Sequence, residues 1–174
     1  QIKSATLFGI NAREITVEVD ASQGLPSEQI VGLPDAVIKE SKSRIKAAIK
    51  NTGFKYLVKS YTINLAPAEL PKEGPLFDLA IAIGLLNATQ QIKIITNALV
   101  VGELSLNGDV KPVRGILSIC QLAIKNNIKK VIIPYENYAE AALIPELEHI
   151  PIKNLKEIRT LSTKKSSPPP PLTI

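Results

Sequence analysis

The chain has 174 residues, of which 45% are hydrophobic and 21% charged, with a formal net charge of +5. This composition suits one folded domain of ordinary size and excludes general disorder. The apolar runs are far shorter than the roughly 20 residues of a membrane-spanning helix, and the aromatic content of 4% argues against a single-strand binder built on base stacking.

The first half of the chain predicts a hairpin, a loop and a helix. Residues 4–20 indicate two strands around a turn at 9–11, because apolar and polar side chains alternate after that turn. Residues 21–35 are rich in Gly, Pro and Ser and are expected to be a loop, either a plain connection or a contact for a neighbouring subunit or nucleic acid. The next segment predicts a helix with Pro34 in its first turn and Gly53 just after its end.

That helix has one apolar face and one basic face. The apolar face carries Ile38, Ile45, Ala48 and Ile49. The basic face is formed by residues at spacings of three and four, with an arginine on its flank: Lys39, Lys42, Lys46, Lys50 and Arg44. It fits either contact with a phosphate backbone or an ordinary solvated surface, and the sequence leaves both interpretations open.

The second half alternates strands and helices. After a strand that begins at Tyr61 and ends at Pro67, the stretch "PKEGPLFDLAIAIGLL" predicts a helix over 77–87 that is apolar nearly all round and therefore central. A hairpin with its turn at Asn107 and Gly108 follows over 98–113. The remaining predicted elements are a helix at 114–127, a strand at 128–134, a broken helix at 138–147, a short strand at 149–152 and a last helix at 154–161. This order predicts an α/β fold with a mixed sheet packed with helices.

The chain is expected to divide into a domain over residues 1–161 and a Pro-rich linker over residues 162–174. Four consecutive prolines in the linker favour an extended spacer toward another domain. The chain contains no methionine, so we expect it to be part of a longer protein. A single cysteine and the absence of a signal-peptide pattern favour the cytoplasm.

Few residues carry chemistry of their own. No phosphate loop of the form G-x-x-x-x-G-K-[ST] occurs, and we expect no cofactor and no metal in this chain. Cys120 and His149 stand outside any ligand-like cluster and are expected to be a buried helical residue and an ordinary strand residue. Asp78 falls in a first helical turn, where its carboxylate favours the helix dipole, although a subunit contact by this segment is an alternative.

Two stretches of the chain also resemble a known protein family. "PKEGPLFDLAIAIGLL", followed by "VVGELSLNGDVKPVRGILSICQLAIKNNIKKVIIP", resembles the proteolytic domain of Lon-type proteases, which implies a Lon-like fold of the ribosomal S5 domain 2 type. That family carries a catalytic serine after Gly-Pro and a catalytic lysine two residues after the glycine of Val-x-Pro-x-x-Gly. Here the two positions hold Leu76 and Leu117, which implies no catalytic residue. Ser118 is adjacent but projects about 100° away around the helix.

The segments "VGLPDAVIKES" and "LPKEGPLFDLAIAIG" resemble the amino-terminal domain of the ComM/YifB family, often labelled magnesium-chelatase-like. The resemblance implies a non-catalytic accessory domain that precedes an AAA+ ATPase module acting as a DNA branch-migration helicase in natural transformation. It implies that ATP and Mg bind to that absent module and that the full-length protein forms a hexamer. The expected partners are the ATPase module and, as a candidate, DNA, and no membrane contact is expected. The chelatase label is expected to belong to the ATPase part.

Two other functions stay open at this point. The first is a serine-lysine peptidase of Lon type working from a displaced dyad that uses Ser118. The second is a purely structural coupler that touches only its own ATPase.

Overall fold

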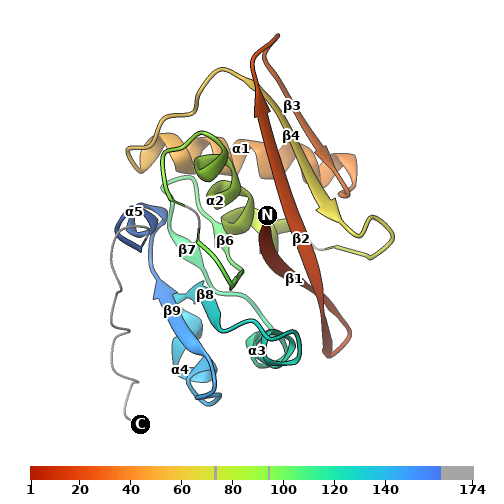
Figure 1. The fold of residues 1–174 in the computed structure, drawn as a ribbon, viewed down its shortest axis with the longest axis vertical. Coiled ribbons are helices and arrows are strands. Elements are labelled where there is room, and N and C mark those ends of the chain that lie inside the picture. The colour runs from red at the N-terminus through yellow and green to blue at the C-terminus, as the bar shows by residue number, and fades with distance from the viewer. Residues whose placement is uncertain (73, 94, 162–174) are drawn as a thin grey trace.

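A computed structural model describes residues 1–72, 74–93 and 95–161, and the predicted linker at 162–174 lies outside them. The described residues form a mixed seven-stranded sheet in the order β3-β4-β2-β1-β5-β8-β9, with a separate two-stranded β6–β7 sheet (Figure 1). The strands are β1 (Ile2–Phe8), β2 (Asn11–Ser22), β3 (Ser27–Val31), β4 (Ser60–Ala66), β5 (Ala98–Val100), β6 (Glu103–Leu104), β7 (Val110–Lys111), β8 (Lys130–Pro134) and β9 (Glu148–Ile152).

The helices follow the predicted order. They are α1 (Asp35–Asn51), α2 (Asp78–Ala88), α3 (Ile116–Lys125), α4 (Tyr138–Ala141) and α5 (Ile158–Leu161), with short 3-10 turns η1 (Gly74–Phe77), η2 (Tyr135–Asn137) and η3 (Leu155–Glu157). The α/β class is therefore confirmed. No helix among the described residues combines the length and the apolar character needed to cross a bilayer.

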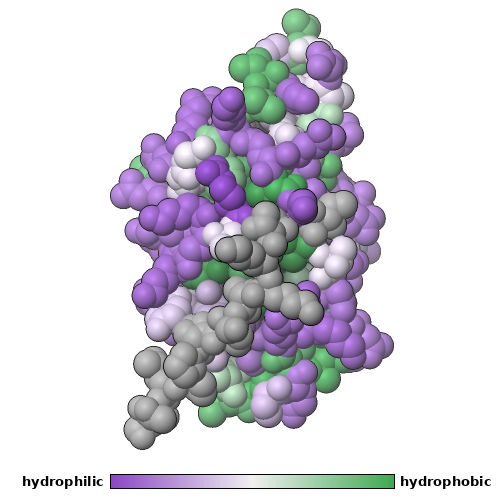
Figure 2. Space-filling view, turned by 60° about the vertical axis from the view of Figure 1, so that its left-hand side comes forward, coloured by the Kyte–Doolittle hydropathy of each residue, from purple (hydrophilic) through white to green (hydrophobic). Residues whose placement is uncertain are grey.

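The sheet separates two hydrophobic cores. Successive side chains of a strand point to opposite faces, so Val100 and Ile132 pack with α1 and α2, whereas Leu99, Val131 and Ile133 pack with α3 and α4. Helix α2 is buried from Asp78 to Leu86, as its uniformly apolar sequence predicts. Figure 2 shows a face on which hydrophilic residues predominate, with hydrophobic residues scattered among them.

Two sequence predictions need correction. Residues 21–35 are not only a loop, because β3 lies inside them and pairs in parallel with β4. Ile30 is buried there, and the strand is stabilised by this distant partner rather than by a local pattern. The hairpin predicted over 98–113 is also divided. Its first strand breaks at Gly102, so β5 joins the large sheet between β1 and β8 while β6 pairs with β7.

Candidate functional site

Four lysines converge on one groove at the β3–β4 edge of the sheet. The groove encloses about 330 Å³ between α1, β3 and the segment that leads into β4. We call it the lysine groove, and its lining residues are Pro26, Ser27, Glu28, Lys42, Lys46, Lys50, Tyr56, Leu57, Val58, Lys59 and Tyr61.

Helix α1 supplies three of these lysines because residues four apart lie on one side of a helix. Lys42, Lys46 and Lys50 therefore form a row along α1, and Lys59 lines the same groove from the segment before β4. Lys39, one turn earlier on α1, is exposed and does not line the groove. Lys59 lacks any sequence signal, because only the pairing of β4 with β3 brings it next to α1.

Tyr56 and Glu28 hold the wall of the groove together. The Tyr56 hydroxyl donates a hydrogen bond to the Glu28 carboxylate, and burial together with this bond raises the pKa of Tyr56. The Lys46 ammonium lies 5.4 Å from the centre of the Tyr56 ring, a cation–π contact. Lys42 donates to the Glu28 carbonyl oxygen at 2.5 Å. Two of the lysines are thus positioned by neighbours before any ligand arrives.

Arg44 has a different environment from the lysines beside it. Its Nε and one terminal nitrogen donate to the two carboxylate oxygens of Asp78 at 2.8 Å and 3.2 Å, which joins α1 to α2. Asp78 is fully buried and also accepts from the Leu104 amide at 3.2 Å. Burial raises the pKa of Asp78 to about 6, although Arg44 and the Leu104 amide pull it down. This ion pair accounts for Arg44, and a nucleic-acid contact by it stays a prediction.

Leu76 and Leu117, which the resemblance to Lon-type proteases puts at the reactive positions, carry hydrocarbon side chains. We call Leu76 and Leu117, with the turn at Gly102, the leucine-filled site. Leu76 is 8% exposed and packs in the core with Ala5, Leu99 and Ile116, while Leu117 is half-buried. The turn at Leu76 is held by main-chain bonds, because the Gly102 amide donates to the Leu76 carbonyl at 3.1 Å and the Leu79 amide donates to the Gly102 carbonyl at 3.0 Å.

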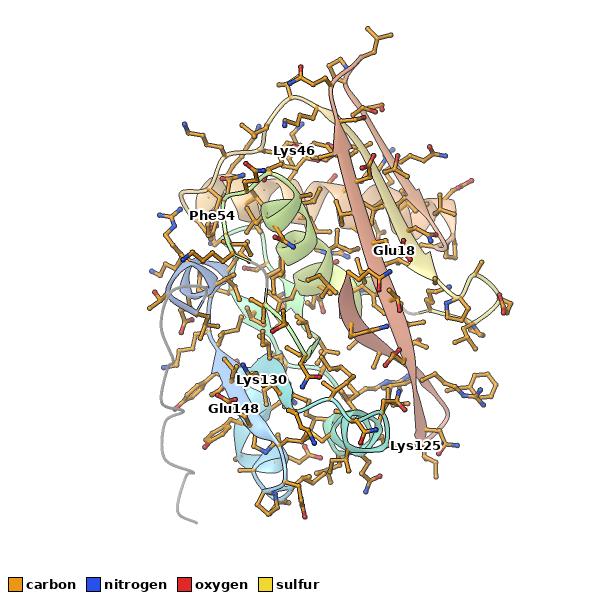
Figure 3. All side chains as sticks on the ribbon, in the orientation of Figure 1. Glu18, Lys46, Phe54, Lys125, Lys130 and Glu148 are labelled. Carbon is orange, nitrogen blue, oxygen red and sulfur yellow. The ribbon has the colours of Figure 1, made fainter. Side chains whose placement is uncertain are left out.

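Ser118 lies outside this site. Its hydroxyl donates to the Ile10 carbonyl at 2.7 Å, so its proton points to a main-chain acceptor rather than to a base. It lines a second cavity of about 570 Å³ between the β1–β2 hairpin and α3, where Lys125 is also found. Figure 3 shows Lys125 on α3 and Lys46 on α1 at opposite ends of the molecule.

Cys120 and His149, the remaining candidates, lie in the core and in an edge strand. Cys120 is fully buried in α3, and burial raises the pKa of its thiol to about 11. His149 lies in the edge strand β9, where its Nε2 is 2.7 Å from the Ile144 carbonyl oxygen. Within the described ranges, no group of three His, Cys, Asp or Glu side chains could hold a metal ion.

Comparisons with known proteins agree with the fold. The family model described as subunit ChlI of Mg-chelatase matches residues 17–137. The chain is 44% identical to the protein YifB of Escherichia coli K12 over 82% of its own length and 28% of that protein. It is 40% identical to the competence protein ComM of Haemophilus influenzae over 83% of its length and 29% of ComM. It is 31% identical to Lon protease 2 of Bacillus subtilis over 90% of its length and 32% of that protease.

The chain spans less than a third of the length of these relatives. The expectation that the chelatase label belongs to the ATPase part is wrong, because the family model matches this domain directly. The match covers more than half of the chain, and the similarity to YifB and ComM extends over most of it. The chain therefore belongs to the family of subunit ChlI of Mg-chelatase, as a domain of the ComM and YifB type.

Proposed function

We propose that this chain is a non-catalytic accessory domain of a ComM-type AAA+ ATPase, where it aids ring assembly and guides DNA. The observation that carries the proposal is the replacement of both reactive positions by leucine, with Leu76 packed into the core. One hydrophobic replacement is compatible with a rearranged active site. Two in partner positions remove both the nucleophile and its base. ATP, Mg and hexamer formation belong to the ATPase module under this proposal.

The lysine groove supports the DNA part of the proposal. It gathers three of the four predicted lysines of α1, and Lys59 adds a fourth cation from another element. Each phosphate that such a cation neutralises releases a counterion, so binding of this kind weakens as salt rises. An ordinary solvent-exposed basic helix does not need to line a groove, whereas three lysines of α1 do line one.

A fluorophosphonate probe separates the accessory role from a peptidase with a displaced dyad. We expect no labelling of the wild-type chain and no peptide hydrolysis. Labelling that disappears in Ser118→Ala would overturn the non-catalytic assignment.

DNA contact is tested by the affinity of the chain for DNA across a salt series. We expect measurable binding at low salt that is lost when Lys42, Lys46 and Lys50 are changed together to glutamine. Absence of binding at low salt, or binding that this triple variant retains, contradicts DNA guidance and leaves the chain as a structural coupler to its ATPase.

A further inference from the structure

We propose that the lysine groove is a track for one single-stranded nucleic-acid backbone, read through its phosphates alone, with Glu28 limiting the affinity. This inference rests on the proposed DNA contact and names its ligand and its limits. It concerns the four lysines that line one groove, three from α1 and one from the segment before β4, rather than the basic face of α1 as a whole.

The shape of the groove favours one strand. Lys42, Lys46 and Lys50 are separated by four residues each, which places successive side chains about 6 Å apart along α1. Lys59 joins them from a different element, the segment before β4. A volume of about 330 Å³ lies at the small end of ligand cavities, so the groove has room for one backbone. A duplex is too wide to enter and would touch only the rim.

The aromatic residues of the groove do not offer stacking platforms. Tyr61 is 2% exposed, and its hydroxyl donates to the Leu57 carbonyl at 2.7 Å. Tyr56 is half-buried, packs against Tyr61 with ring centres 5.6 Å apart, and lies under Lys46. Base stacking needs an open ring face, whereas Tyr61 is buried and Lys46 lies over the ring of Tyr56. Recognition therefore depends on phosphate charge and shows little base preference.

Among the described residues that line the groove, Glu28 is the one acidic side chain. The Tyr56 hydroxyl holds its carboxylate in the wall, where it repels a phosphate that approaches the lysines. A like charge in a binding site lowers affinity and disfavours tight, long-lived complexes. A nucleic-acid strand that is guided through an ATPase motor must also be released, and repulsion by Glu28 limits the affinity with which the groove holds it.

The chain offers matched variants for the test. Lys59→Gln changes a lysine of the groove that is not on α1. Lys39→Gln changes an exposed lysine of α1 that lies outside the groove. Glu28→Gln removes the repelling charge and keeps an oxygen that can accept from Tyr56. Circular dichroism and urea unfolding check that each variant retains the fold.

Fluorescence anisotropy then measures the affinity for a labelled oligothymidylate, a mixed-sequence single strand and a duplex of equal length, from about 50 to 200 mM salt. We expect both single strands to bind alike and more tightly than the duplex. Lys59→Gln should weaken binding about fivefold to tenfold at the lowest salt and reduce the salt slope by about 0.7, the loss of one phosphate contact. Lys39→Gln should leave affinity within about twofold, and Glu28→Gln should tighten binding several-fold.

The outcomes separate this inference from the function on which it rests. If no nucleic acid binds, the DNA contact itself fails. The DNA contact stands but the single-strand groove is overturned if the duplex binds more tightly or if Lys39→Gln weakens binding as much as Lys59→Gln. It is overturned also if free thymidine monophosphate at equal nucleotide concentration displaces the oligonucleotide, because the ligand is then a lone phosphate. Unchanged affinity in Glu28→Gln overturns the role given to that carboxylate.

Discussion

The lysine groove and the leucine-filled site differ in what forms them. In the leucine-filled site, main-chain bonds through Gly102 hold the turn at Leu76, and the Leu76 side chain belongs to the core. The lysine groove is formed by side chains from α1, β3 and the segment before β4, and its charges face solvent. The first arrangement depends on main-chain atoms and not on the side chain at position 76, whereas the second depends on the side chains themselves.

The largest effect should come from the ion pair that joins α1, which carries lysines of the groove, to α2, which follows the turn at Leu76. Asp78→Ala leaves Arg44 without its partner and the Leu104 amide without its acceptor. We expect a loss of about 3–5 kcal/mol in the free energy of unfolding, as for other buried pairs with one partner removed. Urea unfolding measures this, with Glu40→Ala as control, because Glu40 is exposed and 4.0 Å from Arg44. A loss below about 1 kcal/mol would show that the pair does not join α1 to α2.

The leucine-filled site can be tested by two matched truncations. Leu76→Ala removes a side chain that is 8% exposed, and we expect a cost of about 2–4 kcal/mol. Leu117→Ala removes one that is half-buried, and the cost should be about 1 kcal/mol. The same unfolding measurement compares them. Equal costs at the two positions would contradict the assignment of Leu76 to the core.

Asp78 also gives the fold a pH dependence of known sign. Its pKa is raised to about 6 in the folded chain, above the ordinary value of about 4, so the folded state holds this proton more tightly than the unfolded state. The contribution of Asp78 to stability is therefore full below about pH 4 and lost as pH rises through about 6. The size is on the order of 1–3 kcal/mol.

Asp78→Asn lacks this titration. The free energy of unfolding of the wild type minus that of the variant should fall between about pH 4 and pH 6 and then level off. A difference that stays flat between about pH 4 and pH 6 and changes only below about pH 4 would mean that Arg44, rather than burial, dominates the carboxylate.

The smallest effect is expected in the groove. Lys46→Gln and Lys50→Gln replace exposed side chains, so each should change the free energy of unfolding by less than about 0.5 kcal/mol. Lys46 also loses its contact with the Tyr56 ring, a contact that is worth little where solvent reaches it. Thermal unfolding of both variants beside Lys39→Gln measures this. A drop above about 1.5 kcal/mol would make the groove part of the core rather than a surface for a ligand.

The sequence predicted α1 and α2 well because their signals are local. Pro34 and Gly53 bound α1, and the apolar run after Asp78 has no polar face to expose. Strand β3 was missed because it depends on pairing with β4, more than thirty residues away in the chain.

The groove was predicted only in part for the same reason, because contacts between distant residues leave no local sequence signal. Three of its lysines repeat at helical spacing, whereas Lys59 and Tyr56 join them only through tertiary structure. The sequence predicts Asp78 in the first turn of α2. Its ion pair with Arg44 could not be predicted, because the two residues lie far apart in the chain and no helical or strand spacing connects them.

The bonds between Gly102 and the turn at Leu76 have a consequence for how such proteins change over time. Both bonds use main-chain atoms, so replacing the side chain at position 76 leaves them intact. A lineage can therefore exchange a nucleophile for a hydrocarbon there in single mutational steps, and each intermediate keeps the turn. Loss of catalytic activity during evolution then requires no change of fold, only a different side chain at a position whose main-chain conformation stays the same.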